Sequence, residues 1–121
     1  MAMQKGGAEW RIFVLDDEDT RYYDAESITL PSDNIVSVWV KPEYNDKGII
    51  KMVEKFAKKY ENISRTMSLV EINCSDKRRR TIALHDYSTE GTIIFSSARE
   101  YEWTPIVPGS VAGALFKAVC K

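Results

Sequence analysis

The two cysteines are the side chains whose types and positions most directly suggest chemistry in this sequence. Cys74 lies mid-chain in LVEINCSDK, and Cys120 is the penultimate residue. A disulfide between them would close a long loop and stabilise the fold by ~4 kcal/mol in the chain-entropy model. The alternative is a pair of buried or idle thiols in a cytosolic protein. We favour the disulfide on these residues, and it would indicate an oxidising compartment.

Two clusters of charge could each bind a partner. The densest is the basic run Lys77, Arg78, Arg79 and Arg80, which could hold an acidic partner or could simply be solvated side chains at a hairpin tip. The acidic run 16–19 could supply oxygens to calcium, but its spacing matches no EF-hand loop. With one histidine and no C-x-x-C spacing, zinc is not expected either. We therefore predict no metal and no cofactor.

Aromatic residues and the single histidine are the remaining candidates. Tyr22, Tyr23 and Trp39 could form a recognition face, although aromatic residues on strands more often pack in a core. His85 next to Asp86 suggests a catalytic dyad, but adjacent strand residues point to opposite faces. No nucleophile, metalloprotease, phosphate-loop or dinucleotide motif is present. The sequence therefore predicts a protein that is not an enzyme.

Bulk properties exclude several classes of partner. The 121 residues carry a formal net charge of −1, so no overall field favours nucleic acid, which we exclude as a partner. No apolar run approaches the ~20 residues of a membrane helix. The start, MAM, is typical of cloning, so residues 1–8 are expected to be cloning-derived or disordered and 9–121 to form a single domain. An export signal or a membrane anchor would then lie upstream of this start.

Alternating apolar residues predict a strand–helix order that repeats once. Strands are expected at 10–15, 20–30 and 34–41, followed by an amphipathic helix over 46–62 with Asp46 as its N-cap. Three more strands are expected at 66–74, 79–87 and 91–103, and prolines 105 and 108 are expected to break the sheet. Ser110 is the expected N-cap of a closing helix over 111–120. The predicted fold is α+β, a six-stranded antiparallel sheet built from two three-stranded meanders, each followed by a helix.

Several short segments, in order along the chain, resemble the bacterial surface-adhesin protein E family. They are YYDAESI, VSVWVK, the segment from EINC to RRR, EGTIIF, and EWTPIVPGS with the closing VC. The resemblance implies an exported domain with an antiparallel sheet, helices and a disulfide near the C-terminus, formed here by Cys74 and Cys120. It also implies a surface adhesin, because the family's namesake binds extracellular proteins such as vitronectin, laminin and plasminogen.

We therefore expect a non-enzymatic exported domain, in the periplasm or at the cell surface, that binds an extracellular or envelope protein. The alternative is a periplasmic module that binds a small ligand or serves an envelope complex. A weak hydrolase with His85 at its centre is a third alternative, which we favour least. A homodimer and a membrane anchor both stay open, and the sequence does not name the partner.

Overall fold

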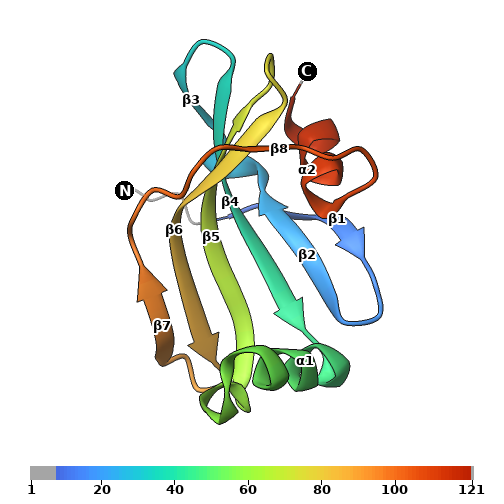
Figure 1. Ribbon diagram of the computed structural model, residues 1–121, viewed down its shortest axis with the longest axis vertical. Helices are drawn as coiled ribbons and strands as arrows, with labels where there is room; N and C mark the ends of the chain where they lie inside the picture. The colour runs from blue at the N-terminus through green and yellow to red at the C-terminus, as the bar shows by residue number, and fades with distance from the viewer. Residues whose placement is uncertain (1–7, 121) are drawn as a thin grey trace.

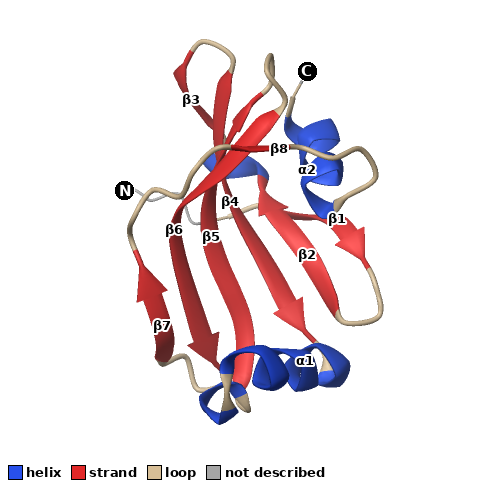
Figure 2. Ribbon diagram, in the orientation of Figure 1, coloured by secondary structure: helices blue, strands red, loops and turns tan. Residues whose placement is uncertain are grey.

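The computed structural model describes residues 8–120 and contains eight antiparallel strands and two short α-helices (Figures 1 and 2). Most of the segment 1–8, expected to be cloning-derived or disordered, lies outside the described residues. Neither α-helix in the described part is long and apolar enough to cross a membrane. The strands are β1 (Trp10–Leu15), β2 (Asp19–Asp24), β3 (Thr29–Ser32), β4 (Ile35–Tyr44), β5 (Ile63–Asn73), β6 (Arg78–Ser88), β7 (Ile93–Ser97) and β8 (Thr104–Pro105).

The prediction of six strands in two meanders is wrong. The described residues form one mostly-β sheet in the order β1-β2-β4-β5-β6-β7, in which β3 pairs with β4 and β8 pairs with β6. Strand β5 pairs with β4 along most of its length, so the halves expected as separate meanders share one continuous sheet. The two additional strands arise where the sequence predicted single long strands.

The expected strand over 20–30 breaks after Asp24. The carboxylate of Asp24 accepts the backbone N–H of Glu26 at 2.9 Å and so caps a 3₁₀ turn, η1 (Ala25–Ser27). The chain then returns as β3 beside the first residues of β4. A side chain that satisfies backbone donors locally thus competes with continuation of the strand.

The expected strand over 91–103 ends at Ser97, and a separate short strand follows. This strand, β8, pairs Thr104 with Arg79 and Pro105 with Arg78 at the start of β6. Pro105, expected to break the sheet, instead lies within it. Proline is tolerated there because β8 is an edge strand whose outer side needs no backbone N–H.

The first helix, α1 (Asp46–Phe56), is shorter than predicted. Its N-cap is Asn45 rather than Asp46, because the Asn45 side chain accepts the N–H of Gly48 at 3.0 Å. The helix ends at Ala57, whose φ of 102° lies where an L-residue is strained, and a 3₁₀ turn, η2 (Lys58–Tyr60), follows. Tyr60 therefore lies outside the helix on which the sequence placed it.

The second helix, α2 (Val111–Val119), packs against one end of one face of the sheet, which we call the front face; Figure 1 shows the helix at the upper right. As predicted, Ser110 caps it by accepting the N–H of Gly113 at 3.1 Å. Leu115 and Val119 pack against a buried cluster contributed by β2, β4 and β5: Tyr23, Val36, Val38, Val40, Val70 and Ile72. The predicted Cys74–Cys120 disulfide is confirmed, and it ties the end of α2 to the end of β5.

A β-bulge changes which side chains of β6 reach the front face. Leu69 pairs with Ala83 and Val70 pairs with Thr81, so Ile82 is an extra residue in β6. Regular alternation along the predicted strand 79–87 would put Thr81 on the same face as His85. That prediction is wrong, because Thr81 lies opposite the buried Val70 and Arg79 lies opposite the buried Ile72.

Candidate functional site

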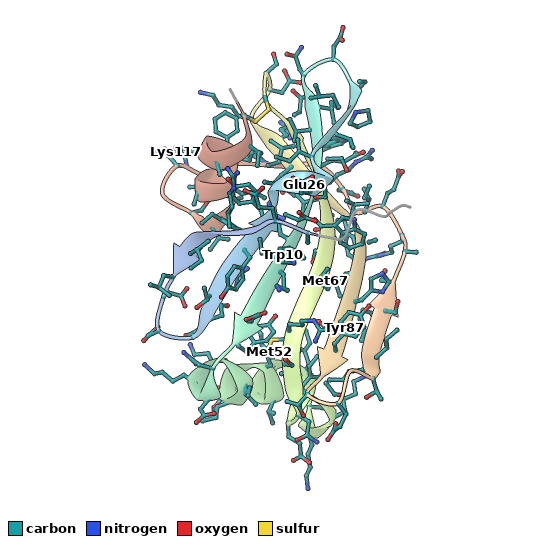
Figure 3. The ribbon with its side chains drawn as sticks, turned by 180° about the vertical axis from the view of Figure 1, so that it is seen from behind. Trp10, Glu26, Met52, Met67, Tyr87 and Lys117 are labelled. Atoms are coloured by element: carbon teal, nitrogen blue, oxygen red, sulfur yellow. A yellow bond between two sulfur atoms is a disulfide. The ribbon has the colours of Figure 1, made fainter. Side chains whose placement is uncertain are left out.

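The opposite side of the sheet, the back face, carries aromatic side chains from four strands, β1, β2, β4 and β6, and is covered by neither α-helix (Figure 3). In register, Tyr22 lies opposite Lys41, His85 opposite Met67, and Tyr87 opposite Arg65. Figure 3 shows Trp10, Met67 and Tyr87 along this side. We call these residues, together with Trp39, the aromatic face: Trp10, Tyr22, Trp39, Lys41, Arg65, Met67, His85 and Tyr87.

Lys41 organises one end of the aromatic face. Its ammonium nitrogen lies 4.3 Å from the centroid of the Trp10 ring and 5.2 Å from that of Tyr22. The same nitrogen lies 3.1 Å from the carboxylate of Glu43. A cation between two rings and one carboxylate has little freedom, so these rings are held in a fixed arrangement.

The other end of the face is a series of ring contacts. The rings of Trp39 and His85 stack with centroids 6.3 Å apart, and His85 lies at the same distance from Tyr87. The guanidinium carbon of Arg65 lies 4.6 Å from the centroid of the Tyr87 ring. Three rings and a guanidinium therefore form a continuous series of contacts along this end of the face.

A hollow of about 410 Å³ lies at the centre of this surface. Its only acidic lining residue, Asp24, already accepts the backbone N–H groups of Glu9 and Glu26 at 2.8 and 2.9 Å. The remaining lining is mainly aromatic or apolar, which favours a partner that presents flat or apolar groups. The lining residues are Ala8, Trp10, Asp24, Trp39, Met67, His85 and Tyr87.

The structure divides the aromatic candidates of the sequence between the two faces. Tyr22 and Trp39 lie on the aromatic face, but Tyr23 is buried on the front face. There its ring meets Phe13 edge to face, with centroids 6.1 Å apart. Tyr23 is therefore a core residue and not part of a recognition surface.

The basic run also separates, because alternate strand residues point to opposite faces. Lys77 lies in the turn before β6, and Arg79 lies on the front face. On the back face Arg80 lies 2.8 Å from Glu71 and 3.3 Å from Glu100, and its guanidinium carbon is 4.6 Å from the Trp103 ring centroid. Arg78 is exposed beside it. The four residues do not converge on a single anion site.

The carboxylates of the acidic turn are held apart by different partners. Backbone N–H groups of Glu18 and Asp19 lower the pKa of Asp16, and the bonded ammonium of Lys47 lowers the pKa of Asp17. Burial raises the pKa of Asp19, whose carboxylate pairs with Arg21 at 3.1 Å. Within residues 8–120, no group of three or more His, Cys, Asp or Glu side chains could hold a metal ion.

His85 and Asp86 are adjacent on one strand and, as expected, point to opposite faces. They therefore do not form a dyad. Asp86 is buried on the front face, where it accepts the hydroxyls of Tyr60 at 2.7 Å and Thr66 at 2.6 Å. Burial, followed by the bond to Asp86, raises the pKa of Tyr60. These contacts fix the end of η2 against the sheet.

On the back face, the Nδ1 atom of His85 lies 2.7 Å from the Ser96 hydroxyl. A histidine beside a serine is two thirds of a hydrolytic triad. Within the described residues, however, no carboxylate hydrogen-bonds the second ring nitrogen to orient the imidazole. The pair can hold β7 against β6, but the third group that activates such a nucleophile is not part of this arrangement.

Sequence reasoning missed most of the aromatic face. Trp10, Lys41, Arg65, Met67 and Tyr87 were not singled out, although each lies on the outward side of its strand. A usable signal exists, because most residues that alternate with the buried valines and isoleucine of β4 and β5 are large or charged. Their assembly depends on strand register, which alternation within one strand does not give.

The fold and the aromatic face define a small β-sheet domain in which a disulfide secures a terminal helix. The chain belongs to the surface-adhesin protein E family, whose model matches residues 10–121. The resemblance of the sequence segments to this family is thereby confirmed. No curated protein and no solved structure gives a significant match.

Proposed function

We propose that this domain is an exported, non-catalytic adhesin that binds an extracellular or envelope protein through the aromatic face. The observation that carries the proposal is the uncovered sheet face of fixed tryptophan, tyrosine, methionine and arginine side chains. These residue types are enriched at protein interfaces, and tryptophan, tyrosine and arginine supply most binding hot spots. Membership of a surface-adhesin family supports the same class of partner.

The rigidity of the face supports binding rather than simple exposure. Cation–π and ring contacts hold Lys41, Trp10, Tyr22, Arg65 and Tyr87 before any partner arrives. A preorganised surface loses less side-chain entropy on binding than a mobile one does. The intervening cations also limit contact between the rings and water, because their stems cover apolar surface.

Binding to immobilised vitronectin and laminin, measured by interferometry, tests the proposal. The wild-type domain should bind at least one of them saturably, and Trp39→Ala should weaken that binding at least about tenfold. Phe56→Ala is the matched control, since Phe56 is a half-exposed aromatic residue on α1, away from the aromatic face. Equal losses in the two variants would reject the face, and no saturable binding to either protein would reject matrix adhesion.

Export is a separate part of the proposal, supported by the disulfide between Cys74 and Cys120. Fractionation of cells that express the native gene should place the protein in the periplasm or on the surface. Alkylation without reductant should label neither cysteine. A cytosolic product with two labelled thiols would contradict export whatever the binding assays show.

The second candidate function is that of a periplasmic module that binds a small ligand. A hollow on the front face, distinct from the aromatic face, favours it. Retention in the periplasm without binding to matrix proteins would support this function over adhesion.

A further inference from the structure

The front-face hollow has an apolar floor beneath the start of α2. Its volume is about 250 Å³. Val40, Val70 and Ile72 of the central strands form the floor, and Phe13 and Leu115 are the large apolar side chains beside it. The floor is continuous with the hydrophobic core, so an alkyl group placed there would contact carbon atoms on several sides.

The charged side chains that line this hollow are both positive. Arg21 and Arg79 line it and no carboxylate does. The guanidinium of Arg21 is already paired with Asp19, at 3.1 and 3.2 Å. Arg79 is exposed and, within residues 8–120, makes no ion pair. Arg79 is therefore the cation available to a ligand.

Two further features favour a negative charge at the same place. The first two residues of α2, Val111 and Ala112, line the hollow, and the leading N–H groups of a helix have no carbonyl partner within it. The hydroxyl-bearing residues Ser68 and Thr81 also line it. A carboxylate beside Arg79 would thus find charged and neutral donors next to an apolar floor.

We propose that this hollow binds an alkyl carboxylate of medium chain length. The chain lies on the valine and isoleucine floor, and the carboxylate pairs with Arg79. The volume is below the range of about 300–1,000 Å³ typical of sites for larger ligands, which favours a medium chain over a full-length lipid. The proposal rests on the second candidate function, the binding of a small ligand, and is independent of the adhesin function, because the hollow lies on the other side of the sheet from the aromatic face.

Octanoate is a suitable probe, with 1-octanol as its uncharged match. Calorimetry should give saturable binding of octanoate that is at least about tenfold tighter than that of 1-octanol. Across butanoate, hexanoate and octanoate, each added methylene should tighten binding about fourfold. In ¹H–¹⁵N spectra the largest shifts should fall on Val70, Thr81 and Val111 rather than on the indole N–H of Trp39.

Arg79→Gln should reduce octanoate affinity to about that of 1-octanol, because the chain keeps its floor and loses its ion pair. Arg78→Gln is the matched control, since Arg78 is the adjacent exposed arginine on the opposite face. Val111→Trp should abolish binding of both probes by filling the hollow from a position 39% exposed, where a larger side chain leaves the core intact.

Three results would overturn the proposal. They are equal affinity for octanoate and 1-octanol, equal losses in Arg79→Gln and Arg78→Gln, and spectral shifts that lie away from the hollow. Trp39→Ala should retain octanoate binding, which separates a failure of this site from a failure of the aromatic face.

Discussion

Val38 and Trp39 are neighbours in β4 and lie in two different environments. Val38 has 0% exposure, within the front-face cluster that Leu115 and Val119 of α2 complete. Trp39 is half-buried on the back face, where its ring stacks on His85. The same division separates Tyr23 from Tyr22, so consecutive residues serve different purposes along the same strands.

The difference teaches how one sheet can supply both a core and a binding surface. On the front face, small β-branched side chains leave room for a helix, and the helix removes them from water. On the back face, broad rings and long cations cover one another and need no helix. Stability therefore resides mainly on the front face, which leaves the back face for the partner binding that we propose.

Removal of the disulfide that links α2 to β5 should have the largest effect on the stability of the front face. Cys74→Ala with Cys120→Ala should lower the free energy of unfolding by ~4 kcal/mol, because the unfolded chain loses the constraint of a closed loop. Urea denaturation measures this loss. Cys120→Ala alone should cost nearly as much, since either change removes the cross-link. A loss below about 1 kcal/mol would mean that α2 stays docked without the bond.

A pair of neighbouring substitutions tests the division directly. Val38→Ala should cost about 2–3 kcal/mol, as the sum of lost burial and the cavity left behind. Trp39→Ala removes a larger side chain yet should cost only about 1 kcal/mol, because cross-strand contacts at a partly exposed site contribute less. Urea denaturation measures both variants. If Trp39→Ala proved the more destabilising, the back face would be a second core.

The division into faces was readable from sequence where alternation is regular. Val36, Val38 and Val40, and the run from Thr66 to Ile72, lie on the faces that their period of two predicts. The Ser110 cap and the Cys74–Cys120 disulfide were also predicted correctly. In these places local pattern and tertiary packing agree, and a single sequence is sufficient.

Irregular features account for what the sequence did not predict. The bulge at Ile82 moves the side chain of Thr81 to the other face of the sheet. No pattern of apolar residues in the sequence indicates this extra residue. Ala57 ends α1 at a positive φ without the glycine that usually marks such a position. Strands β3 and β8 are two to four residues long and form through backbone pairing, so they leave no hydrophobic period.

The front face also contains tyrosines whose titration couples to folding. Burial raises the pKa of both Tyr60 and Tyr44 above the ordinary value of 10.0. An unfolded chain loses these protons near pH 10 and the folded chain retains them, so stability should fall as pH rises above about 10. Each tyrosine contributes up to about 1.4 kcal/mol per pH unit.

Tyr60→Phe should reduce this alkaline slope by about half, and Tyr44→Phe should act similarly. Urea denaturation between about pH 9 and 11 measures the slope, and tyrosinate absorbance reports ionisation in the folded state. A wild-type slope equal to that of Tyr60→Phe would indicate that Tyr60 ionises freely. In that case the polar contacts around Asp86 would not be part of the stable front face.

The smallest expected effect concerns the ion pairs of the back face. Arg80 lies 2.8 Å from Glu71, and the two side chains are 23% and 13% exposed. A double-mutant cycle with Arg80→Gln and Glu71→Gln should give a coupling energy of about 0.5–1 kcal/mol, since partly solvated pairs gain little over hydration. Added salt should reduce the coupling somewhat, because ions screen partly exposed charges, although less than fully exposed ones.

This small coupling is what a binding face requires. Arg80 also lies 3.3 Å from Glu100, whose side chain is 68% exposed, so a carboxylate of the partner can replace Glu100 at little cost while Arg80 stays positioned over the Trp103 ring. A salt-insensitive coupling above about 2 kcal/mol would instead identify the pair as structural. The back face would then hold the sheet together as the front face does, and binding would have to use Lys41 and Arg65.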